Sequence, residues 1–377
     1  MRMLVHFPEE VVAEILLRLP VKSLIKFKSV CRSWRTLIND PSFAKRHLRF
    51  NANRVSSSAV LYLTWFRLVA ADSYMFEQVH ALVTLSRGGC GGNEDVDDDQ
   101  LPCTTEILDL PSIPGTGKEE LRSGDLCNGV LWFRGTTGAV LYNPANREFK
   151  ILPRRFPDYL VSGEGFGYDS KANDYKFVRI RVSVSTKEHF AEVYTIGSDS
   201  WREIKIDPKP PLLAFLHQSK GLHYKGICYW LGTSGDRLTI VCFDMSSEEF
   251  YTIPLSDNIQ KHGGYLNKLA VWNKSVVLLR KHDHFVVDMW VMDDSLGESK
   301  GPLTWTKHMT VGPLPDIGLP VAFWKSDEFL SFTYCGRLVS YNIGTKRMKY
   351  LPIDRTDGGL ALADFYVESL VSLKGRN

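Results

Sequence analysis

Few residues in this chain of 377 stand at the spacings that catalysis requires. The segment Gly115–Lys118 supplies glycines and a lysine, but it lacks the preceding loop and the following Ser or Thr of a phosphate-binding loop. His282 and His284 could present two metal ligands on one face of a strand, yet no third ligand accompanies them. No G-x-S-x-G nucleophile elbow occurs. The sequence therefore predicts no catalytic residues, no cofactor and no metal site.

Other groups that could be reactive have structural explanations. Gly165 and Gly167 are followed by Tyr168 and Asp169 rather than by the rest of a dinucleotide fingerprint, so we expect turn or bulge glycines. Cys31 lies in an apolar helical stripe, where burial would raise the pKa of its thiol and make it inert. The seven cysteines include no C-x-x-C pair, which argues against a zinc module and favours reduced thiols in an intracellular protein.

One segment, residues 88–99, combines glycines with a cluster of acids. Its acids are Glu94, Asp95, Asp97, Asp98 and Asp99. Such a composition is typical of a solvated loop. The alternative is that these carboxylates attract a basic protein target by electrostatic steering.

The overall charge is nearly balanced, with 46 Lys and Arg residues against 43 Asp and Glu residues. A dedicated nucleic-acid binder would be strongly basic, so we expect no nucleic-acid partner. Residues 1–50 nevertheless hold ten basic and four acidic residues, a formal charge of +6, which leaves −3 for the remainder. No apolar run reaches the roughly 18 residues of a membrane span, and Pro8, Glu9 and Glu10 interrupt any signal-peptide core, so we expect no membrane association.

The basic N-terminal segment has the pattern of short helices. Apolar residues recur at helical spacing up to Leu19, and Pro20 ends this helix. Two more short helices follow, and Asp40-Pro41 provides the N-cap and first residue of a last one. In residues 7–48, 20 of 42 residues are apolar, which is more than so small a domain can bury by itself. The segment must therefore dock on the body of the chain or on another protein.

These residues resemble an F-box. The matching text is Phe7–Glu10, Glu14–Leu24, Val30–Trp34, Leu37–Ile38 and Asp40–Phe43, with Phe7 where the family usually has Leu. The resemblance implies a helical module that binds a SKP-type adaptor, which in turn binds a cullin. The positions that it assigns to the adaptor interface, or to its immediate support, are Phe7, Pro8, Ile15, Leu16, Leu19, Pro20, Leu24, Val30, Cys31 and Trp34.

The body beyond residue 55 alternates short apolar stretches with Gly, Pro, Asn and Asp turns, which is typical of an all-β fold. Five aromatic residues recur at intervals of 52, 49, 47 and 51 residues, namely Tyr142, Tyr194, Phe243, Trp290 and Tyr341. Four of them are followed seven positions later by a large apolar residue, which predicts a strand, a turn and a second strand. A period near 50 indicates a kelch-like propeller with one four-stranded blade per repeat.

We predict about six blades. The first spans about residues 55–112, and the others begin near residues 121, 163, 221, 264 and 318. The tail 365–372 has a strand-like pattern. We expect it to return to the first blade and close the ring.

The body also resembles the plant F-box-associated interaction domain. Matching text includes Leu141–Pro144 with Phe149–Pro153, Gly165–Asp169 with Asn173–Lys176, and Phe323–Glu328. Within that family the chain is similar to S-locus F-box proteins and their paralogues. For an S-locus protein the resemblance implies recognition of a basic S-RNase in self-incompatibility, whereas a paralogue would share the motifs and have another target.

We therefore expect a small all-α F-box of three to four helices over residues 1–50, followed by an all-β kelch-like propeller over residues 51–377. The expected function is that of a non-catalytic substrate receptor of a cullin-based ubiquitin ligase in the cytoplasm or the nucleus. It would act by proximity, because it holds target lysines near a charged conjugating enzyme. Two alternatives remain open: a kelch-like propeller enzyme with a helical cap, and a scaffold that binds the adaptor but serves no ligase.

Overall fold

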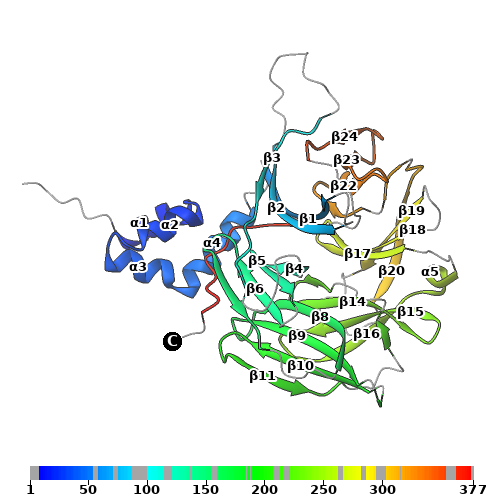
Figure 1. The fold of residues 1–377 in the computed structure, drawn as a ribbon, viewed down its shortest axis with the longest axis horizontal. Helices are drawn as coiled ribbons and strands as arrows, with labels where there is room; N and C mark the ends of the chain where they lie inside the picture. Colours follow the sequence, from blue (N-terminus) through cyan, green and yellow to red (C-terminus); the bar gives the residue numbers. More distant parts are fainter. Residues whose placement is uncertain are drawn as a thin grey trace, which may run out of the picture.

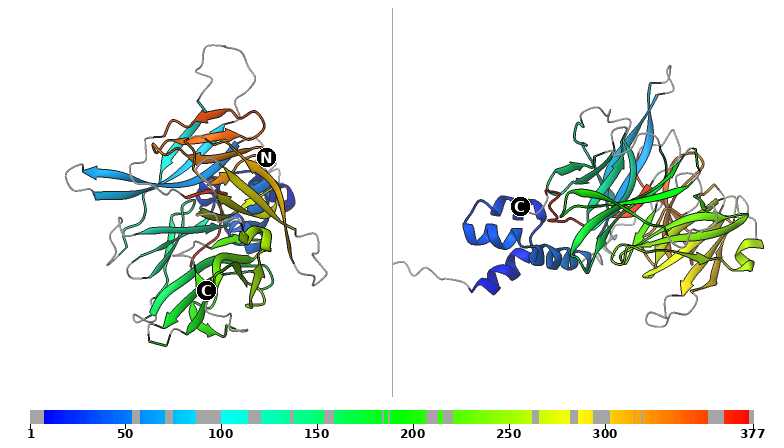
Figure 2. Two further views of the ribbon diagram at one scale, coloured as in Figure 1. Left: turned by 90° about the vertical axis from the view of Figure 1, so that its right-hand side faces the viewer. Right: turned by 90° about the horizontal axis from the view of Figure 1, so that it is seen from below.

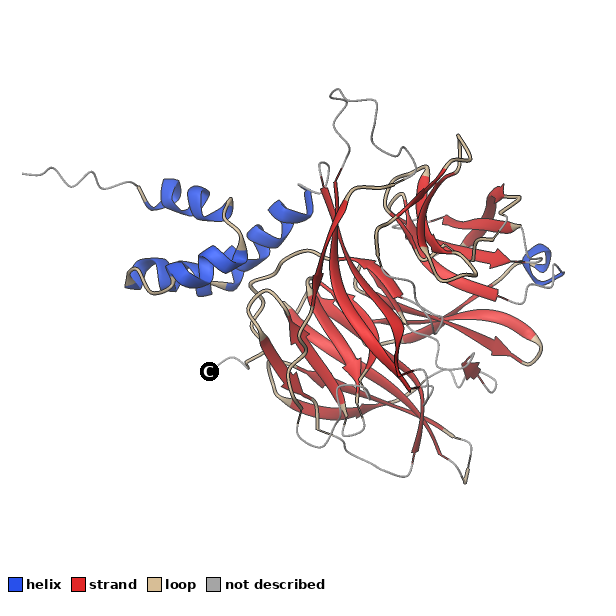
Figure 3. Cartoon of the chain, turned by 45° about the horizontal axis from the view of Figure 1, so that its top comes forward, coloured by secondary structure: helices blue, strands red, loops and turns tan. Residues whose placement is uncertain are grey.

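The structure is a computed structural model of the whole chain. It describes residues 8–53, 58–70, 75–86, 100–113, 121–135, 138–153, 159–183, 185–186, 188–206, 213–215, 221–261, 266–281, 286–293, 303–314, 316–318, 320–353 and 362–374. Over these residues the chain forms a small helical module beside a large all-β body (Figure 1). Figure 3 shows the same division, with the helices of the module grouped to one side of the strands.

The helical module consists of four helices. They are α1 (Glu9–Leu17), α2 (Val21–Phe27), α3 (Arg32–Asn39) and α4 (Pro41–Asn53). Two acids in the first turn of α1 stabilise the helix, because they lie at the positive end of its dipole. Pro20 separates α1 from α2. The Asp40 carboxylate accepts a hydrogen bond from the Ser42 amide at 2.6 Å, which confirms the predicted N-cap of α4.

The body is a propeller of six antiparallel sheets, as predicted. The first three blades are β1 (Ser58–Ala70), β2 (Met75–Ser86), β3 (Cys103–Ile107) with β25 (Leu362–Phe365); β4 (Arg122–Cys127), β5 (Val130–Arg134), β6 (Ala139–Asn143), β7 (Glu148–Ile151); and β8 (Tyr159–Asp169), β9 (Asp174–Ser183), β10 (His189–Thr195), β11 (Ser200–Ile204). The last three are β12 (Leu213–Phe215), β13 (Leu222–Tyr224), β14 (Ile227–Ser234), β15 (Arg237–Asp244), β16 (Phe250–Pro254); β17 (Leu266–Trp272), β18 (Ser275–Lys281), β19 (Val287–Asp293), β20 (Thr304–Val311); and β21 (Ala322–Phe323), β22 (Glu328–Phe332), β23 (Leu338–Asn342), β24 (Met348–Tyr350). A short helix, α5 (Asp257–Lys261), joins blades 4 and 5.

The end of the chain closes the ring. Strand β25 pairs with β1 in antiparallel register, from Leu61 opposite Phe365 to Thr64 opposite Leu362. It is the inner strand of blade 1 and contacts the inner strands β21 of blade 6 and β4 of blade 2. The predicted return of the tail is therefore confirmed. The predicted extent of the strand was wrong, because pairing ends at Phe365 and residues 366–373 form no strand.

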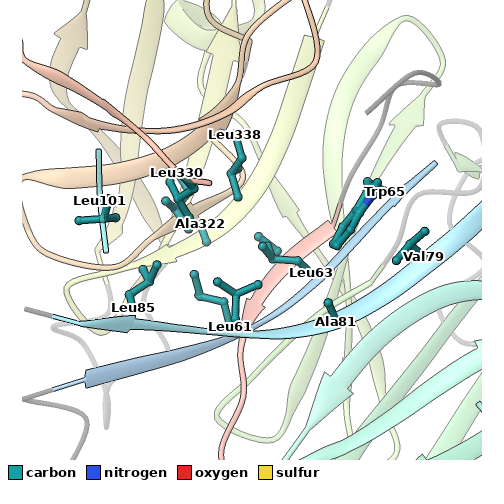
Figure 4. Close-up of a cluster of buried hydrophobic side chains, with 13 residues drawn as sticks. Leu61, Leu63, Trp65, Val79, Ala81, Leu85, Leu101, Ala322, Leu330 and Leu338 are labelled. Atoms are coloured by element: carbon teal, nitrogen blue, oxygen red, sulfur yellow. The ribbon is translucent and has the colours of Figure 1, made fainter. Parts of the chain in front are cut away.

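The seam between the first and last blades is apolar. Side chains from β1 and β2 point toward side chains of blade 6 (Figure 4). The cluster includes Leu61, Leu63, Leu85, Ala322, Leu330 and Leu338, and Ala363 of β25 belongs to it. Each fully buried leucine contributes about 1.5–3 kcal/mol. Closure therefore rests on a continuous core as well as on strand pairing.

The repeat in the sequence corresponds to one hairpin in each blade. The aromatic residue and the apolar residue seven positions later are cross-strand partners, as in Tyr142 with Phe149 and Tyr194 with Trp201. The turn between them has a left-handed residue at the same place in four blades, namely Arg147, Asp199, Glu248 and Lys346. The interval of seven therefore reflects strand pairing. Trp290 pairs with Lys307 instead, because a longer connection separates β19 from β20.

Two glycines have a different role from the predicted one. Gly165 and Gly167 lie within the paired region of β8, so the expectation of turn or bulge glycines was wrong. A Cβ atom on Gly165 would lie 2.8 Å from the Cys228 sulfur, and one on Gly167 would lie 2.5 Å from the His223 ring. Both glycines allow blade 4 to approach the inner strand of blade 3.

Candidate functional site

Exposed apolar side chains are concentrated in the helical module. Val11, Ile15 and Val30 are 41%, 51% and 59% exposed, and they are three of the six large apolar side chains that the described residues leave exposed. Val11 and Ile15 are one turn apart on α1 and so share a face. Val30 directly precedes Cys31, the N-cap residue of α3. These three side chains leave apolar area on a small module that a partner protein could cover.

The predicted adaptor-binding residues differ in burial. Phe7 lies outside the described residues. Five are exposed, namely Pro8, Ile15, Pro20, Val30 and Cys31, whereas Leu19 and Trp34 are partly buried and Leu16 and Leu24 are buried. The exposed group can contact a partner directly, and the buried pair can only support that group from below. The prediction missed Val11, although its spacing of four residues from Ile15 was a usable signal.

Cys31 does not lie in the buried position that the sequence suggested. Its side chain is exposed, and its sulfur accepts a hydrogen bond from the Trp34 amide at 3.5 Å. The residue has extended backbone angles and begins α3 instead of continuing an apolar stripe. Its apolar neighbour Trp34 packs against Phe27, with 5.5 Å between the ring centroids.

Polar contacts join α4 to α1 and to Leu19, which follows α1. The buried His47 ring bonds through Nε2 to the Leu19 carbonyl oxygen at 2.8 Å, and burial lowers the pKa of this histidine. Arg46 donates to Glu14 at 2.7 Å. These contacts hold the helix that carries Ile15 in one orientation relative to the rest of the module.

The module packs on the propeller. Ala145, in the turn between β6 and β7, belongs to the apolar core of the module. The Lys22 ammonium lies 3.5 Å from the Glu106 carboxylate of β3, and the Lys45 ammonium lies 5.7 Å from the centroid of the Tyr168 ring on β8. Blades 1 to 3 therefore all contact the module, and the right-hand view of Figure 2 shows the helices on one side of the propeller.

One buried ion-pair network in the propeller spans two blades. Lys176 of blade 3 donates to Asp169 at 2.6 Å and also lies 2.6 Å from the Glu248 carboxylate of blade 4. Burial opposes ionisation of Asp169, but hydrogen bonds from Lys176, from the Ala172 amide and from Ser246 outweigh it and lower the pKa to about 2. Lys176 thus links blade 3 to blade 4, and its contacts with Asp169 and Glu248 have a structural explanation.

The sequence candidates for chemistry gain no support from the described residues. Residues 115–118, His282, His284 and the five acids of residues 94–99 lie outside them. Within the described ranges no group of three or more His, Cys, Asp or Glu side chains could hold a metal ion. Burial lowers the pKa of His223 to about 4 and raises that of the Cys228 thiol, so both are neutral near pH 7. None of the described helices has the length and apolarity needed to cross a membrane.

A further exposed aromatic residue lies at the end of the propeller opposite the helical module. Successive turns of an antiparallel blade alternate between its two ends, so the β22–β23 turn is opposite the turns that contact the helical module. This turn carries Tyr334, which is 60% exposed. The buried Lys281 of blade 5 donates to the Tyr334 hydroxyl at 2.6 Å and fixes the ring. Sequence reasoning did not identify this position, because an isolated Tyr in a turn has no periodic signal.

Comparison with known proteins matches both parts of the chain. Residues 4–46 match the F-box domain, and residues 95–373 match the F-box associated beta propeller domain. The chain is 27% identical over 383 residues to the F-box/kelch-repeat protein At3g23880 of Arabidopsis thaliana, covering 97% of this chain and 96% of that protein. It is 28% identical over 316 residues to the putative F-box protein At3g21120 of Arabidopsis thaliana, covering 80% of each. The crystal structure of TolB from Acinetobacter baumannii covers 85% of this chain and 72% of its own at 8% identity, and its TM-score of 0.43 is too low to support an argument.

Proposed function

Because the chain belongs to the plant F-box proteins with an F-box associated β-propeller, we propose that it is the substrate-recognition subunit of a SKP–cullin–F-box ubiquitin ligase. The observation that carries this proposal is the exposed apolar set of Val11, Ile15 and Val30 over a packed helical core. A SKP-type adaptor would cover this set, and the adaptor would bind the cullin. The basic charge of the module would add attraction to an acidic partner surface.

The propeller would hold the target protein. A ring of six blades presents many connections that can vary without disturbing the paired strands, and binding residues concentrate on such connections. The end of the propeller opposite the helical module is free of it and carries the fixed Tyr334 ring. The chain itself would perform no chemistry, since its role is to raise the effective concentration of target lysines near the conjugating enzyme.

Calorimetric titration with a purified plant SKP adaptor tests the first half of this proposal. The variant is Ile15→Asp with Val30→Asp, because both side chains are exposed and the substitutions leave the core intact. The matched control is Asn39→Asp with Ala52→Asp, which adds the same charge at exposed helical positions. We expect the control to bind like the wild type and the variant to lose at least 100-fold in affinity. No binding by the folded wild-type chain would refute the proposal.

A narrower proposal concerns the target. By resemblance to S-locus F-box proteins the target would be a basic S-RNase, and Glu94, Asp95, Asp97, Asp98 and Asp99 would attract it. Replacing the five acids by Asn and Gln should slow association with a basic RNase and flatten its dependence on salt. Equal association rates at low salt would remove the acids from the account and leave the receptor function standing.

A further inference from the structure

The segment after the closing strand connects the two parts of the molecule. It comprises residues 366–373, which follow β25 and run between the helical module and blade 2 (Figure 1), and we call it the C-terminal strap. Its buried side chains enter three different cores. Tyr366 packs with blades 1 and 2, Leu370 with the helical module, and Leu373 with blades 2 and 3. One short segment thus belongs to both the module and the propeller.

Blade 2 fixes the path of the strap. The Asn143 side-chain amide donates to the carbonyl oxygens of Ser369 at 3.0 Å and Val371 at 2.8 Å. The Glu148 carboxylate accepts from the Leu373 amide at 2.9 Å. The Tyr366 amide still donates to the Val60 carbonyl oxygen of β1 at 2.8 Å. Beyond it, the Asn143 and Glu148 side chains supply the hydrogen bonds that buried backbone groups require. Contacts with the propeller therefore hold the strap in place independently of its contacts with the helices.

The strap caps a helix of the module. Helix α2 begins after Pro20 and has no side-chain cap of its own. The Val21 amide at its start donates to the Glu368 carboxylate at 3.1 Å, across a sequence separation of 347 residues. An acceptor and a negative charge at this position both stabilise a helix N-terminus.

The strap also fills the core of the module. Leu370 is 7% exposed and lies in the same cluster as Leu16, Val21 and Leu24. The helical segment is too small to bury its many apolar residues by itself. Among the described residues outside the module, the buried side chains of this core are Ala145 and Leu370.

We propose that the C-terminal strap is a structural part of the helical module, so that α1 to α3 hold their binding-competent form only when residues 366–373 are in place. Glu368 and Leu370 are then positioning residues for the surface that carries Ile15 and Val30. Because the strap directly follows β25, the same C-terminal stretch closes the ring and completes the module. The consequence for adaptor binding rests on the proposed function, but the structural claim does not.

Hydrogen exchange of the full-length chain tests the proposal. The variants are Leu370→Asp, which places a charge in the module core, and Leu370→Met, which keeps the volume and serves as the matched control. Amides of α2 report on the module, and amides of β14 and β15 in blade 4 report on the propeller. Affinity for a purified SKP adaptor is measured on the same samples.

We expect exchange of the α2 amides to become at least 10-fold faster in Leu370→Asp, with β14 and β15 unchanged, and adaptor affinity to fall at least 10-fold. Leu370→Met should resemble the wild type in all three measurements. Unchanged α2 exchange in folded Leu370→Asp would overturn the proposal. If the wild type binds no adaptor, the proposed function fails, while the exchange contrast still decides the role of the strap.

A second variant covers the case in which Leu370→Asp unfolds the entire chain. Glu368→Ala removes the cap of α2 without altering the core, and the amide of Val21 loses its partner. We expect faster exchange at the start of α2 alone. If this exchange stays at the wild-type rate, the strap does not support the module.

Discussion

Two adjacent residues of α1 should have opposite roles. Ile15 is 51% exposed and Leu16 is 1% exposed, although both belong to the same apolar run. In the proposed complex, Ile15 contributes to adaptor binding and Leu16 to the stability of the module. Replacing each by Ala separates these two contributions without introducing charge.

The magnitudes follow from burial. Full burial of an isoleucine side chain contributes about 1.5–3 kcal/mol, so covering the exposed half of Ile15 contributes about 0.8–1.5 kcal/mol, or about 4- to 13-fold in Kd. Ile15→Ala should therefore weaken adaptor binding by this factor and change stability by less than about 0.5 kcal/mol. Leu16→Ala should lower the unfolding free energy of the module by about 2–5 kcal/mol, because it leaves a cavity.

Titration calorimetry with a SKP adaptor and hydrogen exchange of α1 and α2 measure the two effects separately. We expect weaker binding with normal exchange for Ile15→Ala, and faster exchange for Leu16→Ala. An Ile15→Ala variant with wild-type affinity, together with a Leu16→Ala variant with wild-type exchange, would show that burial in the structure does not divide these roles.

Three further predictions concern the propeller. Ala363→Asp places a charge in the seam between blades 1 and 6 and should lower the melting temperature sharply; an unchanged melting curve would exclude the closing role of β25. Burial lowers the pKa of His223 to about 4, so the stability linked to this residue is complete above about pH 6.5 and is lost as the pH falls toward 4. His223→Gln should reduce the change of unfolding free energy with pH in that window. Urea titrations at several pH values measure this change, and an equal change in the wild type and the variant would refute the prediction. Burial, with Asp125 beside it, raises the pKa of Asp364, so ionisation costs stability as the pH rises above about 4; Asp364→Asn should therefore stabilise the chain more at pH 8 than at pH 5, and a smaller gain at pH 8 would contradict this sign.

The blades could be predicted because their signal is local. An aromatic residue and an apolar residue seven positions later are cross-strand partners around one turn, so the sequence spacing directly reflects the hairpin. The same holds for α4, where Asp40 and Pro41 mark the helix start within two adjacent residues. Hairpins and helix caps are determined by residues close in the sequence, so they can be predicted without knowledge of the tertiary packing.

Features set by distant segments could not be read from the sequence. Leu370 and Glu368 look like residues of a strand, and only the fold shows that they complete a helical core and cap a helix. Gly165 and Gly167 have no side chain because blade 4 packs close to them. Cys31 is exposed because it is the N-cap residue of α3. The adaptor-binding residues were predicted as a set, but only the packed structure shows which of them are exposed and which are buried.

The central claim is most directly tested by isolating the complex from plant cells. The tagged wild-type chain, the Ile15→Asp, Val30→Asp variant and the Asn39→Asp, Ala52→Asp control are purified in parallel, and the co-purifying proteins are quantified by mass spectrometry. The account predicts a SKP adaptor and a cullin with the wild type and the control, and the loss of both with the variant. A folded wild-type chain that recovers neither protein would contradict the account, and recovery of the adaptor without a cullin would show an interaction scaffold instead of a ligase subunit.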